Sequence, residues 1–185
     1  MTLLLDVDEV AISFVQGYLK VVAEHSGKVF QPADVTDWNL SRCIKLSTAV
    51  QGAVNQDIRA PGFCLDLPVL PGAVEGVQAL REVVDILWVT TPLDGSPTWC
   101  GERLEALKHH FGVDPKDVIF THQKSRVRGN AILDDNPSNL KGFPGVQLLW
   151  DCTHNRESKD HIRICGWEEL KETVKVLNGD FTIET

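Results

Sequence analysis

The chain of 185 residues carries 26 acidic and 18 basic side chains, which gives a formal net charge of −8. This length suits one hydrophobic core with room for an inserted subdomain, rather than two full domains. Because nucleic acid is also negatively charged, we do not expect this chain to bind it through broad electrostatic attraction. The sequence has no basic leader and no apolar run of membrane-spanning length, so we expect a cytoplasmic protein that does not bind a membrane.

The cysteines are five in number and scattered, at positions 43, 64, 100, 152 and 165. Their spacing contains no Cys-x-x-Cys pair, which argues against a disulfide framework and against a structural zinc site. A reducing compartment is therefore expected.

The chain opens with the apolar run Leu3-Leu4-Leu5, which is followed at once by Asp6-Val7-Asp8. Such a run is typical of a buried strand in a parallel sheet, whose carboxyl end faces the ligand crevice. Because side chains alternate along an extended chain, the two carboxylates can point into one crevice. There they would bind a cation, or act as nucleophile and proton carrier. The alternative is a strand that ends in a turn with solvated acids.

A helix is predicted over residues 14–25, where apolar side chains recur with helical spacing before Ser26-Gly27. Residues 31–68 are irregular, with short helical segments predicted within residues 41–54. We therefore predict a small helical cap, residues 13–68, inserted after the first strand. The catalytic core would comprise residues 1–12 and 69–185.

The remaining pattern alternates between helices and strands. Helices are predicted over residues 71–80, 99–111 and 167–177, and strands over residues 83–89, 118–120, 131–133 and 146–150. This alternation predicts an α/β fold with a doubly wound parallel sheet and right-handed crossovers.

Three of these strands end in polar clusters, which are Asp6-Val7-Asp8, Thr90-Thr91 and Asp134-Asp135, and Lys124 precedes the last of them. The carboxyl ends of parallel strands converge on one edge of a sheet, so these side chains are expected to meet. A phosphate monoester repels a carboxylate nucleophile, and a divalent cation together with a lysine would screen that repulsion. Mg²⁺ suits carboxylate and carbonyl oxygens.

In this order the clusters resemble the motifs of the haloacid dehalogenase-like (HAD) superfamily, which has a Rossmann-like core. The resemblance is closest to the 5'(3')-deoxyribonucleotidases of the cytosolic type C family, and it covers roughly residues 3–155, with a weaker match across the insert. The matching segments are residues 6–14, 70–75, 90–92, 121–124, 132–135 and 152–155.

The resemblance implies a role for each cluster. Asp6 would be the nucleophile and a metal ligand. Asp8 would protonate the leaving oxygen, then activate water, and would give its backbone carbonyl to Mg²⁺. Thr90, helped by Thr91, would bind the phosphoryl oxygens, and Lys124 would neutralise charge beside Asp6.

The third metal ligand is predicted to be Asp135, with Asp134 in the outer shell or as the alternate ligand. Sequence does not show which of two adjacent carboxylates points inward. The chain departs from the family at Glu9, where glycine is usual, and at Thr91, where serine is common. Glu9 adds a negative charge near an anion site and so bears on substrate preference.

The resemblance also implies that the cap closes over a nucleoside and that its aromatic side chains stack on the base. Phe14 and then Trp38 are the residues predicted to do so. Such stacking is worth about 1–3 kcal/mol per base. The alternatives are ordinary core packing for Phe14 and a loop position for Trp38.

The expected activity is Mg²⁺-dependent hydrolysis of deoxyribonucleoside 5'- or 3'-monophosphates, with dUMP and dTMP favoured, through a covalent aspartyl phosphate. The expected partner is this small nucleotide, and the resemblance favours a homodimer. One alternative is a HAD-type phosphatase for another small phosphate ester or for a nucleic-acid terminal phosphate, which the acidic charge disfavours. Outside the enzymes, a non-catalytic nucleotide sensor would be expected to lose Asp6 or Asp8, and both are present.

Overall fold

The computed structural model, which describes residues 1–179, contains a six-stranded sheet in the order β3-β2-β1-β4-β5-β6. The strands are β1 (Thr2–Leu5), β2 (Asp85–Thr90), β3 (Val118–Phe120), β4 (Ala131–Asp134), β5 (Val146–Trp150) and β6 (Ile162–Ile164). Neighbouring strands pair in parallel. This strand order is that of a doubly wound sheet, so the predicted α/β fold is confirmed. Residues 180–185 of the predicted core lie outside the described part.

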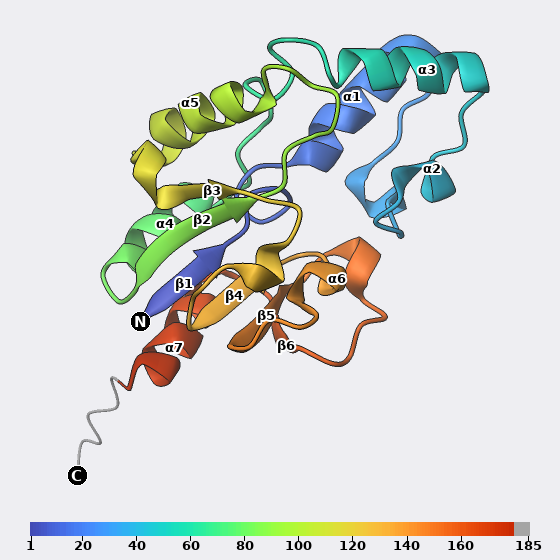
Figure 1. The fold of residues 1–185 in the computed structure, drawn as a ribbon. Coiled ribbons are helices and arrows are strands. Elements are labelled where there is room, and N and C mark those ends of the chain that lie inside the picture. The colour runs from blue at the N-terminus through green and yellow to red at the C-terminus, as the bar shows by residue number, and fades with distance from the viewer. Residues whose placement is uncertain (180–185) are drawn as a thin grey trace.

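Helices cover both faces of the sheet (Figure 1). The helices of the core are α4 (Ala73–Arg81), α5 (Trp99–Phe111), α6 (Pro137–Leu140) and α7 (Trp167–Asn178). Leu3 and Leu5 of β1 belong to the apolar cluster formed with α4, α5 and α7, whereas Leu4 belongs to the cluster on the other face with α6. All three leucines are fully buried, which agrees with a central strand that is apolar on both sides.

Three further helices lie to one side of the sheet (Figure 1). They are α1 (Phe14–Ser26), α2 (Leu40–Cys43) and α3 (Thr48–Asp57). Their apolar side chains form a separate buried cluster with Val35 and Ile58. The two segments that connect these helices to the core lie side by side. Ser13 of the first donates its backbone N–H to the Pro68 carbonyl of the second at 2.8 Å. This arrangement agrees with an inserted helical cap, although its boundaries at residues 13 and 68 stay a prediction.

The structure differs from the predicted elements at α6, at β6 and at the start of β2. Helix α6 was not predicted, because four residues are too few to show a helical period. Strand β6 was not predicted, because it is only three residues long and Arg163 interrupts its apolar pattern. Strand β2 begins at Asp85, two residues later than predicted, because the backbone N–H of Val84 still bonds the Leu80 carbonyl at the end of α4. None of the helices within residues 1–179 has the length and hydrophobicity needed to cross a membrane.

We predict that Gly76→Ala destabilises the fold, because α4 and α7 approach closely at this position. A Cβ on Gly76 would lie 2.3 Å from Cγ of Trp167, whose ring packs on Trp150. Overpacking should lower the free energy of unfolding by about 1–3 kcal/mol, as measured by urea denaturation. Gly101→Ala in α5 is the control, since nothing lies within 4 Å of the added carbon. Equal losses in the two variants would contradict this account.

Candidate active site

The polar residues predicted to meet do lie together at the carboxyl edge of the sheet. Asp6 follows β1, Thr90 ends β2, and Asp134 ends β4. Lys124 begins the short 3-10 helix η3 (Lys124–Arg126), between β3 and β4. Because β1 lies between β2 and β4, Asp6 occupies the centre of this edge.

Lys124 forms a buried charge cluster with two carboxylates. Its Nζ lies 2.5 Å from Oδ1 of Asp6 and 2.7 Å from Oδ2 of Asp134. Its side chain is 2% exposed, so neither ion pair is screened by bulk water. Asp134 also accepts hydrogen bonds from the Asn136 backbone N–H and from Asn139 Nδ2, each at 2.9 Å. Both oxygens of Asp134 are therefore already engaged within the protein.

The pKa shifts of the side chains in this cluster reflect an excess of negative charge. Burial raises the pKa of Asp6 well above its usual value, and the Asp134 carboxylate raises it further, while Lys124 opposes both. Burial alone would lower the pKa of Lys124, but Asp6 and Asp134 hold it above its ordinary value. The ammonium is thus firmly protonated, and one cation serves several carboxylates.

Asp135 faces the same site from the other side. Its Oδ2 lies 2.9 Å from Nε2 of His154, which follows β5 in the 3-10 helix η4 (Thr153–Asn155). This contact is an ion pair rather than an aligned hydrogen bond, because Nε2 has no partner of good hydrogen-bond geometry in the described part of the chain. Burial raises the pKa of Asp135. Burial alone would lower the pKa of His154, but contact with Asp135 raises it.

The three carboxylates of this edge suit a hard divalent cation. Asp6, Asp134 and Asp135 each offer an oxygen, and these atoms lie within 4.8 Å of one another. Mg²⁺ prefers oxygen ligands, and its charge would balance the excess of carboxylates beside Lys124. Since both oxygens of Asp134 are engaged, Asp6 and Asp135 are better disposed to bind a cation directly.

Asp8 does not join this cluster but pairs with an arginine of α5. Nη2 of Arg103 donates to Oδ1 of Asp8 at 2.5 Å. The Arg103 side chain is fully buried, and its Nε and Nη1 have no hydrogen-bond partner among residues 1–179. Its guanidinium also lies 5.0 Å from the centre of the Trp99 ring. Because Asp8 is the hydrogen-bond partner of this buried guanidinium, the ion pair fixes the position of the Asp8 carboxylate.

Sequence reasoning did not single out Arg103, although a signal was present. The buried side chains of α5 recur with helical spacing at Trp99, Arg103, Leu107 and Phe111. A charged residue in the apolar stripe of a helix needs a buried partner of opposite charge. An arginine at a buried position of this stripe therefore predicts an ion pair, but the sequence does not identify Asp8 as the partner.

The two threonines at the end of β2, Thr90 in the strand and Thr91 just after it, have different environments. Thr90 is fully buried and its Oγ1 has no hydrogen-bond partner within the described residues. Thr91 lines the cavity described below, but its Oγ1 already donates to the Thr121 carbonyl at 3.1 Å. The Thr90 hydroxyl is therefore an unpaired donor that could form a hydrogen bond to a phosphoryl oxygen.

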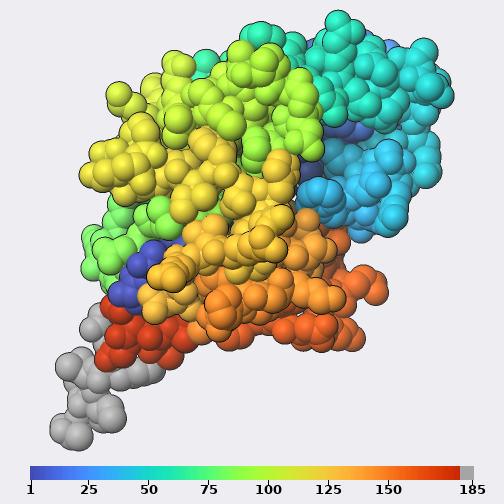
Figure 2. Space-filling model, viewed as in Figure 1, coloured from blue at the N-terminus to red at the C-terminus, as the bar shows by residue number. Residues whose placement is uncertain are grey.

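A cavity of about 590 Å³ opens above this edge, between the core and the cap. Asp6, Asp8, Lys124 and Asp135 line its core side. In Figure 2 the blue N-terminal segment is visible in the hollow between the green part of the core and the cyan insert. The predicted nucleophile is thus open to a ligand, although Asp6 is only 5% exposed.

Both aromatic residues predicted in the cap also line this cavity. Trp38 is 62% exposed, so its indole is available at the cavity mouth. Phe14 is half-buried and packs edge-on against Phe63, with ring centroids 5.9 Å apart. Phe14 therefore combines the two roles considered for it, since it belongs to the aromatic core and also forms part of the cavity wall.

Glu9 has an unusual backbone for a residue other than glycine, with φ of 56° in the left-handed region. Its Oε1 accepts hydrogen bonds from the Val15 backbone N–H at 2.8 Å and from Ser13 Oγ at 3.0 Å, at the start of α1. Burial raises the pKa of Glu9 to about 7. The carboxylate that departs from the family pattern is therefore engaged at the N-terminus of α1.

Comparison with known proteins assigns this geometry to a family. The model of the family described as "5' nucleotidase, deoxy (Pyrimidine), cytosolic type C protein" matches residues 1–178. A protein of Staphylococcus epidermidis, provisionally named a 5'(3')-deoxyribonucleotidase, is 29% identical over 168 residues, which cover 90% of this chain and 92% of the relative. A 5'(3')-deoxyribonucleotidase of Bacillus subtilis is 23% identical over 168 residues, 90% of this chain and 94% of the relative.

Solved structures support the fold. A HAD-type hydrolase of Bacillus subtilis, crystallised with magnesium, superposes with a TM-score of 0.62 at 17% sequence identity. The superposition covers 94% of this chain and 97% of that structure. The present chain therefore has a fold similar to that of this HAD-type hydrolase.

We predict that Lys124→Met strongly destabilises the protein without added metal, because Asp6 and Asp134 would remain buried without a counter-charge. Removal of one partner from a buried ion pair costs about 3–5 kcal/mol in the free energy of unfolding. Lys116→Met is the matched control, since Lys116 pairs with Asp114 at the surface, where ion pairs add little. Denaturant unfolding at pH 7 measures both variants. Similar stability of the two variants would contradict the buried-cluster account.

Proposed function

Because the chain belongs to the family of cytosolic type C deoxy (pyrimidine) 5'-nucleotidases, we propose that it is a Mg²⁺-dependent phosphatase of deoxyribonucleoside monophosphates. The observation that carries the proposal is the buried contact between Asp6 and Lys124 at the floor of a cavity that Phe14 and Trp38 also line. A carboxylate held against an ammonium suits nucleophilic attack on an anionic phosphoryl group. The 5'(3')-deoxyribonucleotidase of Bacillus subtilis supports this substrate class.

In the first step, a carboxylate oxygen of Asp6 attacks phosphorus in line with the leaving oxygen. Asp8 donates its proton to that oxygen, and the nucleoside departs from an aspartyl phosphate on Asp6. In the second step, Asp8 removes a proton from water, which attacks phosphorus and releases phosphate from Asp6. Lys124 neutralises charge beside Asp6, and the Thr90 hydroxyl donates to a phosphoryl oxygen, helped by Thr91.

Asp6, Asp135 and the backbone carbonyl of Asp8 would hold Mg²⁺, which when bound screens the charge of the phosphoryl group. The side-chain oxygens of Asp6 and Asp135, which lie within 4.8 Å of each other, support this assignment, and the Asp8 carbonyl is assigned from the family resemblance. The magnesium bound to the HAD-type hydrolase of Bacillus subtilis is consistent with it. Asp134 supports the site from the outer shell, because its oxygens are engaged by Lys124 and Asn139.

The cavity volume of about 590 Å³ is in the range of small-ligand sites and suits a nucleoside. Trp38 and Phe14 would stack on the base, and the pyrimidine in the family description favours dUMP and dTMP. Either a 5'- or a 3'-ester is proposed, as in the names of the relatives. A cytoplasmic location and a homodimeric state complete the proposal, and both rest on the family alone.

Phosphate release from a panel of esters tests the proposed function. The panel contains 5'- and 3'-monophosphates of deoxyribonucleosides and ribonucleosides, glucose 6-phosphate and a 5'-phosphorylated oligonucleotide, each with Mg²⁺ or with EDTA. We expect Mg²⁺-dependent release that is fastest with dUMP and dTMP, and none with Asp6→Asn. Asp85→Asn, at the exposed opposite end of β2, is the control and should be fully active. The absence of metal-dependent release from the deoxyribonucleotides would overturn the proposal.

Replacing Asp8 or Arg103 should separate proton transfer from nucleophilic attack. Asp8→Asn should slow nucleotide hydrolysis by about 10²–10⁴-fold, the usual contribution of a general acid or base. Arg103→Met should lower kcat for nucleotides, because Asp8 loses the ion pair that fixes its position, and Arg103→Lys should restore part of it.

The diagnostic measurement is formation of the aspartyl phosphate from p-nitrophenyl phosphate, whose leaving group departs without a proton. The burst of p-nitrophenolate should be nearly intact in both Asp8→Asn and Arg103→Met, while their turnover of nucleotides falls. Arg81→Met is the control, since Arg81 bonds the Phe111 carbonyl outside the site. Equal loss of the burst and of nucleotide turnover would assign Arg103 a purely structural role.

A further inference from the structure

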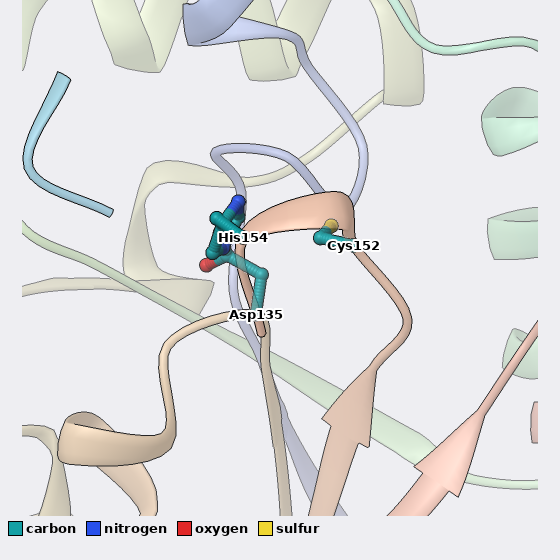
Figure 3. A group of neighbouring side chains, drawn as sticks. All are labelled: Asp135, Cys152 and His154. Carbon is teal, nitrogen blue, oxygen red and sulfur yellow. The ribbon is translucent and has the colours of Figure 1, made fainter. Parts of the chain in front are cut away.

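A second group of potential metal ligands lies beside the carboxylate cluster. Asp135, Cys152 and His154 offer an oxygen, a sulfur and a nitrogen that lie within 4.8 Å of one another. Figure 3 shows Asp135 and His154 side by side, with Cys152 next to them on the turn that carries His154. These residues come from the ends of the neighbouring strands β4 and β5, which fix their separation.

The ring nitrogen Nε2 of His154 lacks a well-formed hydrogen bond in this environment. The side chain is 6% exposed, and Nε2 points at Oδ2 of Asp135 from 2.9 Å without forming an aligned hydrogen bond. A buried ring nitrogen without a well-formed hydrogen bond is costly, unless another group engages it. The Cys152 thiol donates a weak bond to the Glu9 carbonyl at 3.8 Å, and its sulfur accepts from the Asn155 backbone N–H. The sulfur keeps a further lone pair for a cation, and His154 Nε2 can bind one once it gives up its proton.

We propose that Asp135, Cys152 and His154 form a binding site for a thiophilic divalent cation such as Zn²⁺, which overlaps the proposed Mg²⁺ site at Asp135. Zn²⁺ binds thiolate, imidazole and carboxylate in four-coordinate geometry, whereas Mg²⁺ selects oxygen. Binding releases the protons of the Cys152 thiol and of His154 Nε2 to solvent, and a water molecule or the Glu9 carbonyl oxygen completes the coordination.

The cation has its own route to this site. Cys152 and His154 line a smaller cavity of about 240 Å³, which lies between the cap and the loop after β5. Glu9 and His154 line both this cavity and the larger one, so they form the wall between them. A cation can therefore reach Cys152 while a substrate occupies the larger cavity.

The functional consequence follows from Asp135, which both sites share. A cation held by Cys152 and His154 withdraws the Asp135 carboxylate from the Mg²⁺ site, so the site would be inhibitory. This consequence rests on the proposed function, whereas binding of the cation does not.

Titration of the full chain with Co²⁺ alone tests the binding. We expect the near-ultraviolet charge-transfer absorption of a cobalt thiolate, which Zn²⁺ should abolish by displacement. Cys152→Ser should remove this absorption and weaken Zn²⁺ binding by at least the roughly 10–100-fold that loss of a supporting residue costs. Cys43→Ser, at a cysteine of similar partial burial in the cap, is the matched control and should keep both. The absence of the absorption in the unmodified chain, or its persistence in Cys152→Ser, would overturn the proposal.

Inhibition provides the second measurement. At saturating Mg²⁺, Zn²⁺ should inhibit phosphate release by the unmodified chain and by Cys43→Ser, but far less by Cys152→Ser. Equal inhibition of all three would mean that Zn²⁺ acts at the Asp6 carboxylate, which would overturn the inhibitory role. The cobalt spectrum needs no substrate, so failure of this site and failure of the proposed phosphatase activity are distinguishable.

Discussion

The buried ammonium of Lys124 is the interaction on which the site depends. It joins Asp6 after β1 to Asp134 at the end of β4, and so ties η3 to two central strands. Two carboxylates on one ammonium leave one negative charge, and Asp135 adds another that His154 only partly balances. Burial makes this excess costly, which is why the pKa of Asp6 rises. The protein therefore keeps, at the edge of its sheet, a cluster that a divalent cation would stabilise.

Helix α5 connects this cluster to the cap. Arg103 holds Asp8, while the adjacent Glu102 accepts hydrogen bonds from the backbone N–H groups of Gly62, at 2.7 Å, and of Cys64, at 3.1 Å. These amides belong to the segment that returns from the cap to the core. The same helical turn thus fixes the proposed proton carrier and one of the two connections of the cap. A movement of the cap relative to the core would displace α5 and, through Arg103, Asp8.

The sequence predicted the parts of the structure that depend on local pattern. Apolar runs that end in polar residues identified the strands and their convergent ends, including Asp6, Thr90 and Asp135. The partners Arg103 and His154 depend on how helices and loops pack on the sheet, and this information is not local. Sequence also left open which of two adjacent carboxylates faces a cation. The hydrogen bonds that Asp134 accepts from Asn136 and Asn139 support our proposal that Asp135 is the direct ligand.

Glu9 adds a negative charge near the proposed anion site, and its environment reduces the effect of that charge. Burial raises its pKa to about 7, which favours the neutral form more than an exposed glutamate would. When ionised, its Oε1 accepts from the Val15 backbone N–H at the N-terminus of α1, where the helix dipole favours negative charge. Glu9 combines this contact with a left-handed backbone, φ 56°. The same residue therefore anchors the cap, and its charge is turned toward a helix that stabilises it.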